Sequence, residues 1–219
     1  MAEIDFADLN ARERYKLLIS AVVPRPIALV TSISSTAVVN AAPFAFFNAV
    51  CNDPPAVFVG VNSDAGGREK DTAVNIKRSG EFVVNMVDEA LSPLMNLCET
   101  EFPQDVSETT SIGLRTAPSV HVAPPRIEQA PISFECKLLQ TVSLAPGKAI
   151  LIGRVLHMYV DDRLYDPERN YILTDQAGII GRMHGAAAYV RTTDLFDMPR
   201  LSIQEKRERF GELLDAPSK

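Results

Sequence analysis

Two short stretches near the start of the chain carry residues suited to binding a flat, polar ligand. In Pro24-Arg-Pro26, two prolines flank an arginine. Proline favours extended backbone at its own position and at the residue before it, so we expect Arg25 to be presented at the mouth of a strand rather than buried inside one. In Asn40-Ala-Ala-Pro-Phe44, the small side chains and the proline disfavour a helix. This composition is typical of a loop whose backbone comes close to a ligand and offers it amide groups.

The cysteines and histidines predict no metal centre. The three cysteines, Cys51, Cys98 and Cys136, are widely spaced and form no CxxC pair, so we expect buried thiols rather than disulfides or zinc ligands. The three histidines are equally dispersed, and no HExxH motif is present.

Composition and charge narrow the class of protein. With 46% hydrophobic and 23% charged residues, the 219-residue chain has the composition of a soluble globule, which we expect to form one domain. A net charge of -6 without a basic stripe argues against nucleic-acid binding. No apolar run is long enough to cross a bilayer and the first residues do not resemble a signal peptide, so we expect a cytoplasmic protein without a membrane partner.

The elements that must position these residues are mostly strands. Asn10 and Glu13 form a capping box ahead of a predicted helix, and a polar turn joins two arms of a hairpin that brings Thr31 near Asn40. Further strands are predicted at 56–61 and 81–87, helices at 71–78, 89–98 and 202–214, an irregular excursion at 101–126, and a long hairpin at 132–142 and 149–160. Because strands and helices do not alternate regularly, this pattern favours a closed or nearly closed antiparallel barrel. No GxGxxG follows a strand, which disfavours a Rossmann domain.

Seven motifs, taken in order, resemble one family. They are Pro24-Arg-Pro-Ile-Ala-Leu-Val-Thr-Ser32, Asn40-Ala-Ala-Pro-Phe44, Asp53-Pro-Pro55, Lys70-Asp-Thr72 with Asn75-Ile76, Glu81-Phe-Val-Val-Asn85, Glu135-Cys136 and Tyr189-Val-Arg-Thr192. Together they resemble the flavin reductase-like proteins with an FMN-binding split β-barrel, over a body of about residues 15–193, with 194–219 as a C-terminal helical extension. The fold class implied is mainly β with peripheral helices. The resemblance also implies a homodimer with FMN, or FAD, at the subunit interface and NADH or NADPH as reductant.

The resemblance assigns cofactor-binding roles along the chain. The segment holding Arg25, Pro26 and Ile27 is expected to lie against the isoalloxazine ring. Hydrogen bonds to the ring, ribityl chain or phosphate are expected from Thr31, Ser32, Asn40, Ala41, Ala42 and Pro43. The chain departs from the family at the hairpin turn, where members have a glycine and this sequence has Ala37.

A glycine-rich segment that leads into the helix predicted at 71–78 is expected to hold the flavin phosphate. The first turn of a helix has unpaired amides and a partial positive charge, which attract an anion. We expect Arg68, Lys70 and Thr72 to bind the phosphate, with Asp71 as the N-cap of the helix. The alternative is a capped surface helix whose charges are solvated.

Two further polar residues have two interpretations each. His184, in the glycine-rich segment 178–185, either meets the nicotinamide or substrate above the flavin or is an exposed loop residue. Asn48 either contacts the cofactor or caps a turn.

The predicted function is NAD(P)H-dependent reduction of FMN by hydride transfer. This reaction needs no acid, base or nucleophile from the protein, because the cofactors carry the chemistry. The alternatives are a flavoprotein that passes electrons to a partner, such as a monooxygenase, or to a small organic substrate, and an FMN-binding module without turnover. The apolar segment from Phe44 to Phe47 beside the ligand loop predicts a homodimer.

Overall fold

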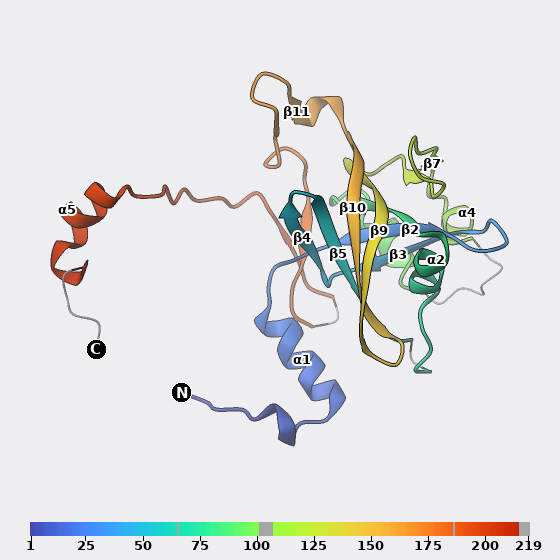
Figure 1. Cartoon of the computed structure of the whole chain (residues 1–219), viewed down its shortest axis with the longest axis horizontal. Coiled ribbons are helices and arrows are strands. Elements are labelled where there is room, and N and C mark those ends of the chain that lie inside the picture. The colour runs from blue at the N-terminus through green and yellow to red at the C-terminus, as the bar shows by residue number, and fades with distance from the viewer. Residues whose placement is uncertain (65, 101–106, 186, 215–219) are drawn as a thin grey trace.

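Strands dominate the computed structural model, which describes residues 1–64, 66–100, 107–185 and 187–214 (Figure 1). The strands are β1 (Arg25–Pro26), β2 (Ala28–Ile33), β3 (Val39–Phe44), β4 (Phe47–Asn52), β5 (Pro55–Val61), β6 (Glu81–Met86), β7 (Thr116–Ala117), β8 (Arg126–Ile127), β9 (Ile132–Ala145), β10 (Lys148–Val160), β11 (Tyr165–Asp166), β12 (Tyr171–Ile172), β13 (Ile180–Arg182) and β14 (Tyr189–Arg191). The helices are α1 (Ala11–Ala21), α2 (Asp71–Ser79), α3 (Ser92–Leu97), α4 (Glu108–Ile112) and α5 (Ile203–Leu214), with short 3-10 turns at Phe6–Asp8 and Asp162–Leu164. Within the described residues, no helix is long and apolar enough to cross a bilayer.

Seven strands form one antiparallel sheet in the order β3-β2-β6-β9-β10-β5-β4. Its two end strands, β3 and β4, do not pair with each other in the described part of the chain, so the barrel stays open between them. Short strands add three smaller sheets, β1-β13-β14, β7-β8 and β11-β12. This is the mainly β, split antiparallel barrel with peripheral helices that the sequence predicts.

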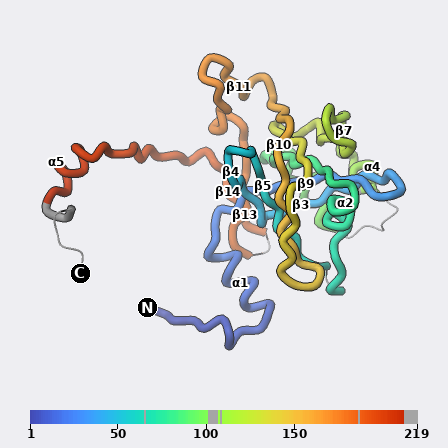
Figure 2. The backbone as a smooth tube through the Cα atoms, viewed as in Figure 1, coloured from blue at the N-terminus to red at the C-terminus, as the bar shows by residue number. Residues whose placement is uncertain are grey.

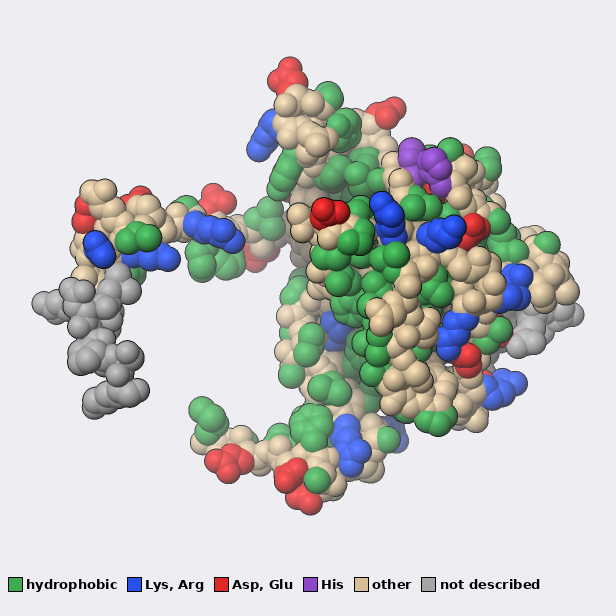
Figure 3. Space-filling view, viewed as in Figure 1, with side chains coloured by type: hydrophobic (Ala, Val, Ile, Leu, Met, Phe, Trp, Pro, Cys, Tyr) green, Lys and Arg blue, Asp and Glu red, His purple; other side chains and the backbone are tan. Residues whose placement is uncertain are grey.

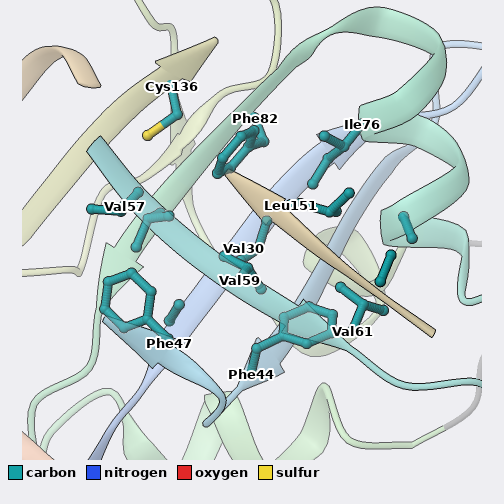
Figure 4. Packing of buried hydrophobic residues seen from close by; sticks show 14 residues of the cluster. Val30, Phe44, Phe47, Val57, Val59, Val61, Ile76, Phe82, Cys136 and Leu151 are labelled. Atoms are coloured by element: carbon teal, nitrogen blue, oxygen red, sulfur yellow. The ribbon is translucent and has the colours of Figure 1, made fainter. Parts of the chain in front are cut away.

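The main core lies between the inner face of the seven-stranded sheet and α2 (Figure 4). Fully buried side chains from four strands and the helix meet there: Val30, Val59, Ile76, Phe82 and Leu151. Burial of each such side chain stabilises the fold by about 1.5–3 kcal/mol. At Gly153 of β10 the packing leaves no room for a side chain, because a Cβ there would lie 2.3 Å from the Phe82 ring. A second buried cluster, around Leu29, Leu91 and Ile127, covers the other side of β2.

Several local predictions are confirmed. The Asn10 side chain accepts hydrogen bonds from the first turn of α1, and the Glu13 carboxylate accepts one from the Asn10 amide at 2.9 Å. Helix α2 ends at Gly80, whose φ of 74° is the left-handed conformation that glycine favours. Ser32 pairs with Asn40 across the β2–β3 hairpin, and β9 with β10 forms the longest hairpin. The hairpin turn holds Ala37 at a φ of 63°, a position where glycine would be unstrained.

Two segments predicted as loops are strands. Residues 40–44 belong to β3, where Ala42 pairs with Val30. Pro43 is tolerated because β3 is an edge strand, whose outer side needs no amide for pairing. The glycine-rich segment 178–185 contains β13, which pairs with both β1 and β14. Pro24 and Pro26 favour an extended backbone, and this backbone forms β1, the strand that pairs with β13.

Three other predictions need correction. The helix predicted at 89–98 covers only Ser92–Leu97, because Pro93 starts a helix well and the preceding residues bend into it. Lys70, not Asp71, is the N-cap of α2, and Asp71 lies in the first turn. Cys51 is exposed on β4, whereas Cys98 and Cys136 are buried as predicted. Within the predicted excursion 101–126, residues 101–106 lie outside the described part, and the rest is irregular apart from α4, β7 and the first residue of β8.

Candidate functional site

A pocket of about 180 Å³ brings together residues from segments that lie far apart in sequence. Its lining residues are Tyr15, Ile19, Arg25, Pro43, Phe44, Ala45, Phe46, Gly60, Asn62, Lys70, Glu99, Arg182 and Gly185. Of the predicted site residues, Arg25, Pro43 and Lys70 therefore meet in one place. Aromatic rings and cationic side chains share the lining, which is the chemistry that a planar ring with an anionic tail requires.

Arg25 lies at this pocket and is the first residue of β1, but it is buried, so the part of the prediction that placed it at the mouth of a strand rather than buried is wrong. Only 5% of the residue is exposed. Its guanidinium donates hydrogen bonds to the carbonyls of Ile19, Val22 and Met183, at 2.8 Å to the last two. The carbonyls of Ile19 and Val22 lie at the C-terminal end of α1, where carbonyl groups lack helical partners and attract a cation. Arg25 thus ties α1 to the segment after β13.

Burial lowers the pKa of Arg25 from its usual value, and the nearby Arg182 contributes in the same direction. The Nε atom of Arg25 is buried without a hydrogen-bond partner in the described part of the chain. A buried donor without a partner costs stability unless a ligand or water satisfies it. This atom is therefore a candidate contact for a ligand in the pocket.

Three of the predicted cofactor-binding residues, Ser32, Asn40 and Thr72, form one hydrogen-bond network with Asn75 between α2 and the β2–β3 hairpin. The Asn40 Oδ1 atom accepts hydrogen bonds from Thr72 Oγ1 at 2.8 Å and from Ser32 Oγ at 3.3 Å. Asn75 donates to Ser32 Oγ at 3.2 Å. The side chains of Ser32 and Thr72 are buried, so this network fixes α2 against the β2–β3 hairpin. Thr31 is also buried, and its hydroxyl donates to the Pro125 carbonyl at 2.6 Å.

The two cations predicted for the phosphate differ in their partners. Arg68 is exposed and forms an ion pair with Asp64, at 2.8 Å from Nε to Oδ2. The backbone amide and the side chain of Arg68 both donate to Asp64, which lowers the pKa of that carboxyl. Lys70 has no carboxylate partner within the described residues, and its Nζ lies 5.8 Å from the centre of the Phe44 ring. No side chain caps the start of α2, so Lys70 stands at a helix N-terminus whose partial positive charge attracts an anion.

The remaining predicted residues lie outside the pocket lining. Ile27 and Ala41 are buried in the second core cluster, and Ala42 packs against the main core. Asn48 is exposed on β4, and its Oδ1 accepts a hydrogen bond from the Ala49 amide at 2.8 Å. His184 is exposed next to Gly185, which does line the pocket. Pro26, half-buried in β1, pairs with Gly181, and Asp71 lies in the first turn of α2.

Sequence reasoning missed several lining residues. Tyr15 was recognised only as part of a helix, yet its ring lies 6.4 Å from that of Phe46 in an edge-on contact. Gly60 makes the close approach of β5 to Phe46 possible, because a Cβ there would lie 2.9 Å from the Phe46 Cβ. Asn62 could have been identified as a site residue because it is a polar residue directly after the strand predicted at 56–61.

A larger cavity, of about 590 Å³, contains none of the predicted residues. It is lined by Asp88, Arg126, Glu128, Gln129, Ala130, Pro131, Tyr159, Val160, Asp161, Asp162, Arg163, Leu164, Gln176 and Ala177. The Arg126 guanidinium lies 4.6 Å from the centre of the Tyr159 ring. No group of three or more histidine, cysteine or carboxylate side chains in the described residues could hold a metal ion.

Comparison with known proteins gives the family. Residues 20–178 match the model of the flavin reductase like domain. The uncharacterized protein YwrF of Bacillus subtilis is 43% identical over 182 residues, covering 81% of this chain and 88% of YwrF.

Two solved structures are similar over nearly their whole length. The 2-nitrobenzoate 2-nitroreductase NbaA of Pseudomonas fluorescens is 36% identical with a TM-score of 0.85, covering 92% of this chain and 98% of that protein. Nitrilotriacetate monooxygenase component B from Bacillus cereus is 32% identical with a TM-score of 0.86, covering 90% of this chain and 98% of that protein. On this evidence the chain belongs to the flavin reductase like domain family.

Proposed function

We propose that this protein is a flavin-dependent oxidoreductase that uses FMN and is reduced by NADH or NADPH. Membership of the flavin reductase like domain family supports the flavin-related oxidoreductase role. The single observation that carries the finer proposal is the position of Lys70. Lys70 is the N-cap residue of α2, where no side chain makes a capping hydrogen bond. It has no carboxylate partner in the described residues, and its Nζ lies over the Phe44 ring in the pocket.

The pocket residues fit an FMN molecule chemically. Phe44, Phe46 and Tyr15 provide apolar and aromatic walls for a planar ring. Lys70 and the first-turn amides of α2 would bind the phosphate, and the unpartnered Nε of Arg25 can donate to a polar ring atom. When bound, the flavin would supply the redox chemistry, namely the capacity to accept reducing equivalents and pass them on.

The contribution of the chain is then binding, alignment and exclusion of water. The network around Asn40 and Thr72 holds α2 in place, which fixes Lys70 relative to the pocket. Arg25 holds α1 in place, which fixes Tyr15. In this proposal, Arg182 at the pocket and the exposed His184 beside Gly185 would meet the nicotinamide or a second substrate.

The size of the pocket favours a homodimer. At about 180 Å³ it is smaller than the roughly 300–1,000 Å³ of most small-molecule sites. A second subunit beside α1 would complete the enclosure. We therefore propose a homodimer with one flavin site per chain.

The acceptor of the electrons has two candidates. The similarity to nitrilotriacetate monooxygenase component B favours a partner monooxygenase as the acceptor. The similarity to a 2-nitrobenzoate nitroreductase favours direct reduction of a small aromatic acid, and the cationic Lys70 and Arg182 in the pocket would suit its carboxylate.

One anaerobic experiment separates these functions. The purified protein is loaded with FMN or FAD, and reduction of the bound flavin by NADH and by NADPH is followed by its absorbance. Free flavin and 2-nitrobenzoate are then added separately as acceptors. Failure to bind either flavin would contradict the proposal as a whole. Binding without reduction by either nicotinamide would indicate a flavin-binding module.

A further inference from the structure

The larger cavity, of about 590 Å³, has no part in the proposed flavin function. It shares no lining residue with the pocket around Lys70. Its volume lies within the roughly 300–1,000 Å³ of most small-molecule sites, whereas the voids of a packed interior rarely exceed a water molecule. Its size is therefore that of a ligand site rather than of a packing defect.

This cavity lies at the base of a projection from the barrel. After β10 the chain leaves the end of the sheet, forms β11 and β12, and returns to β13 (Figures 1 and 2). In the space-filling view the projection stands clear of the rounded body (Figure 3). Residues 159–164, where the projection leaves, and 176–177, where it returns, line the cavity together with Asp88 and the segment that joins β8 to β9.

Backbone hydrogen bonds hold the walls of the cavity together. The Asp161 amide donates to the Pro131 carbonyl at 2.9 Å, which joins the end of β10 to the segment before β9. The Leu173 amide donates to the Leu164 carbonyl at 2.8 Å, which joins the outgoing and returning strands of the projection. The cavity is therefore shaped by the fold itself and needs no ligand to form it.

Arg126 provides an open cation in this lining. Its guanidinium lies 4.6 Å from the centre of the Tyr159 ring, which is a cation–π contact. Its Nε is buried without a hydrogen-bond partner in the described part of the chain. A buried donor of this kind costs stability unless a ligand or water satisfies it, and a carboxylate would do so with a charge-assisted hydrogen bond.

Two ion pairs neutralise part of the remaining charge. The lining contains four carboxylates and two guanidinium groups. Asp161 pairs with Arg163 at 2.6 Å, and Glu128 pairs with Arg115 at 2.9 Å. Hydrogen bonds from Arg163 lower the pKa of Asp161 to about 2, so this pair stays ionised at neutral pH. The charges of the lining that enter no ion pair within the described residues are one cation, Arg126, and two carboxylates, Asp88 and Asp162.

Asp88 is the better placed of the two open carboxylates. It is half-buried, and its Oδ1 accepts a hydrogen bond from the Leu91 amide at 2.8 Å. Its Oδ2 accepts no hydrogen bond from the residues that the structure describes. Asp162 is exposed, so water screens its charge more strongly. An ammonium group in the cavity would therefore bind Asp88 first.

Five apolar residues form much of the remaining wall: Ala130, Pro131, Val160, Leu164 and Ala177. Leu164 and Ala177 are buried in the fold. A ligand that extends past the charged groups would bury apolar surface against these side chains, which favours an apolar substituent over a polar one.

We propose that the larger cavity binds a free α-amino acid with an apolar side chain. The carboxylate of the ligand would accept hydrogen bonds from Arg126, its ammonium group would bind Asp88, and its side chain would lie against Leu164 and Ala177. A zwitterion meets both kinds of open charge. A simple carboxylate would face two open carboxylates, and a simple amine would leave Arg126 unsatisfied. The site goes beyond the proposed flavin function and does not rest on it.

Calorimetric titration of the full chain with L-phenylalanine tests the proposal. Carried out with FMN-saturated protein, it should give saturable binding with a Kd below about 1 mM. N-acetyl-L-phenylalanine, which lacks the ammonium group, and L-phenylalaninamide, which lacks the carboxylate, should each bind at least about tenfold more weakly. Absence of saturable binding, or equal binding of either analogue, would overturn the proposal. The flavin-free protein should bind L-phenylalanine with the same affinity, so a protein that binds the amino acid but no flavin would contradict the proposed function alone.

Three variants locate the binding in this cavity. Arg126→Met keeps an unbranched side chain beside Tyr159 but removes the donors, and should weaken L-phenylalanine binding about tenfold or more. Asp88→Asn keeps the acceptor for the Leu91 amide but removes the charge, and should weaken binding about three- to tenfold.

The matched control is Arg169→Met. The Arg169 guanidinium also lies over a tyrosine, 5.4 Å from the centre of the Tyr171 ring, but it does not line the cavity. This variant should bind L-phenylalanine within about twofold of wild type. Circular dichroism confirms that each variant is folded, and Asp88→Asn keeps the proposal testable if Arg126→Met folds poorly. Wild-type affinity in either folded cavity variant, or an equal loss in Arg169→Met, would overturn the assignment.

Discussion

The charged groups of two regions differ in where their partners lie: the Glu135 carboxylate is hydrogen-bonded inside the fold, whereas the Lys70 ammonium faces the pocket. Around Glu135, a buried carboxylate has all its partners inside the fold: the amides of Val120 and His121, at 2.8 and 2.6 Å, and the Tyr159 hydroxyl, at 2.8 Å. At the pocket, Lys70 is exposed and has no carboxylate partner in the described residues. A charge that is fully satisfied internally stabilises the fold, whereas a charge left open is available to a ligand.

The largest effect should come from Glu135. Glu135→Gln replaces an acceptor of three hydrogen bonds by a group that can accept at only one of the two oxygen positions, so at least one donor to this buried side chain loses its partner. We expect the free energy of unfolding to fall by about 2–4 kcal/mol, measured by urea denaturation. FMN affinity of the folded variant should not change. The control is Glu128→Gln, whose exposed pair with Arg115 should contribute little. A loss of FMN affinity without loss of stability would reverse the roles of the two regions.

The same contrast predicts a pH dependence. Burial alone would raise the pKa of Glu135, but the hydrogen bonds from Val120, His121 and Tyr159 outweigh it and hold the pKa below the usual value of 4.5. A carboxyl with a lowered pKa stabilises the folded state above its unfolded pKa, and this contribution is lost as the pH falls through the folded pKa. The difference in unfolding free energy between wild type and Glu135→Gln should therefore be constant from neutral pH to about pH 5 and shrink below 4.5. A difference that grows on acidification would contradict this assignment.

Next in size is the effect of Lys70→Ala on cofactor binding. A charge-assisted contact to phosphate contributes about 1.5–3 kcal/mol, so FMN binding should weaken about tenfold or more. Riboflavin, which lacks the phosphate, should bind the variant nearly as well as wild type. Fluorescence titration of both flavins measures this. Equal losses for FMN and riboflavin would place the phosphate elsewhere.

Arg68→Ala should have a smaller effect than Lys70→Ala. The sequence alone predicts equal roles for these two cations, but Arg68 is already paired with Asp64 and is largely exposed. Solvent screening and the existing partner leave it less able to attract a phosphate, so we expect FMN affinity to fall only about two- to threefold. Asp64→Asn is the matched variant, because it frees Arg68 and should strengthen FMN binding slightly. A loss for Arg68→Ala as large as for Lys70→Ala would show that Asp64 releases Arg68 when FMN binds.

The fold could be predicted from sequence because the caps and turns that the local sequence favours agree with the strand pairing of the whole sheet. The capping box at Asn10, the turn at Pro146-Gly147 and the glycine after α2 each fix a boundary by local chemistry. The second arm of the β2–β3 hairpin is predicted only as far as Asn40. The rest of β3 is predicted as a loop because Asn40 to Phe44 has a weak strand composition, and its pairing with β2 overrides that preference.

The site was harder to predict for a physical reason. Side chains such as Ser32, Asn40 and Thr72 are suited to ligand contacts, but they can also bond to one another, and only the three-dimensional arrangement shows which. Arg25 is the clearest case, since flanking prolines fix its backbone but not the direction of its side chain. Tyr15 and Gly60 carry no motif, and only their proximity to Phe46 places them at the pocket.

The smallest effect should come from His184. It is exposed and does not line the pocket, although the neighbouring Gly185 and Arg182 do. His184→Ala should therefore leave FMN affinity within about twofold of wild type, because no contact to the flavin is removed. If His184 meets the nicotinamide, one hydrogen bond is lost and the KM for NADH or NADPH should rise about two- to fivefold with little change in kcat. His121→Ala, an exposed histidine whose ring lies 5.4 Å from His157 in the Glu135 region, is the control and should change neither quantity. A clearly weaker affinity for FMN in His184→Ala would show that His184 contacts the flavin itself. Equal effects of both variants on KM would remove His184 from the rim of the site and leave Lys70 as the main open charge of the pocket.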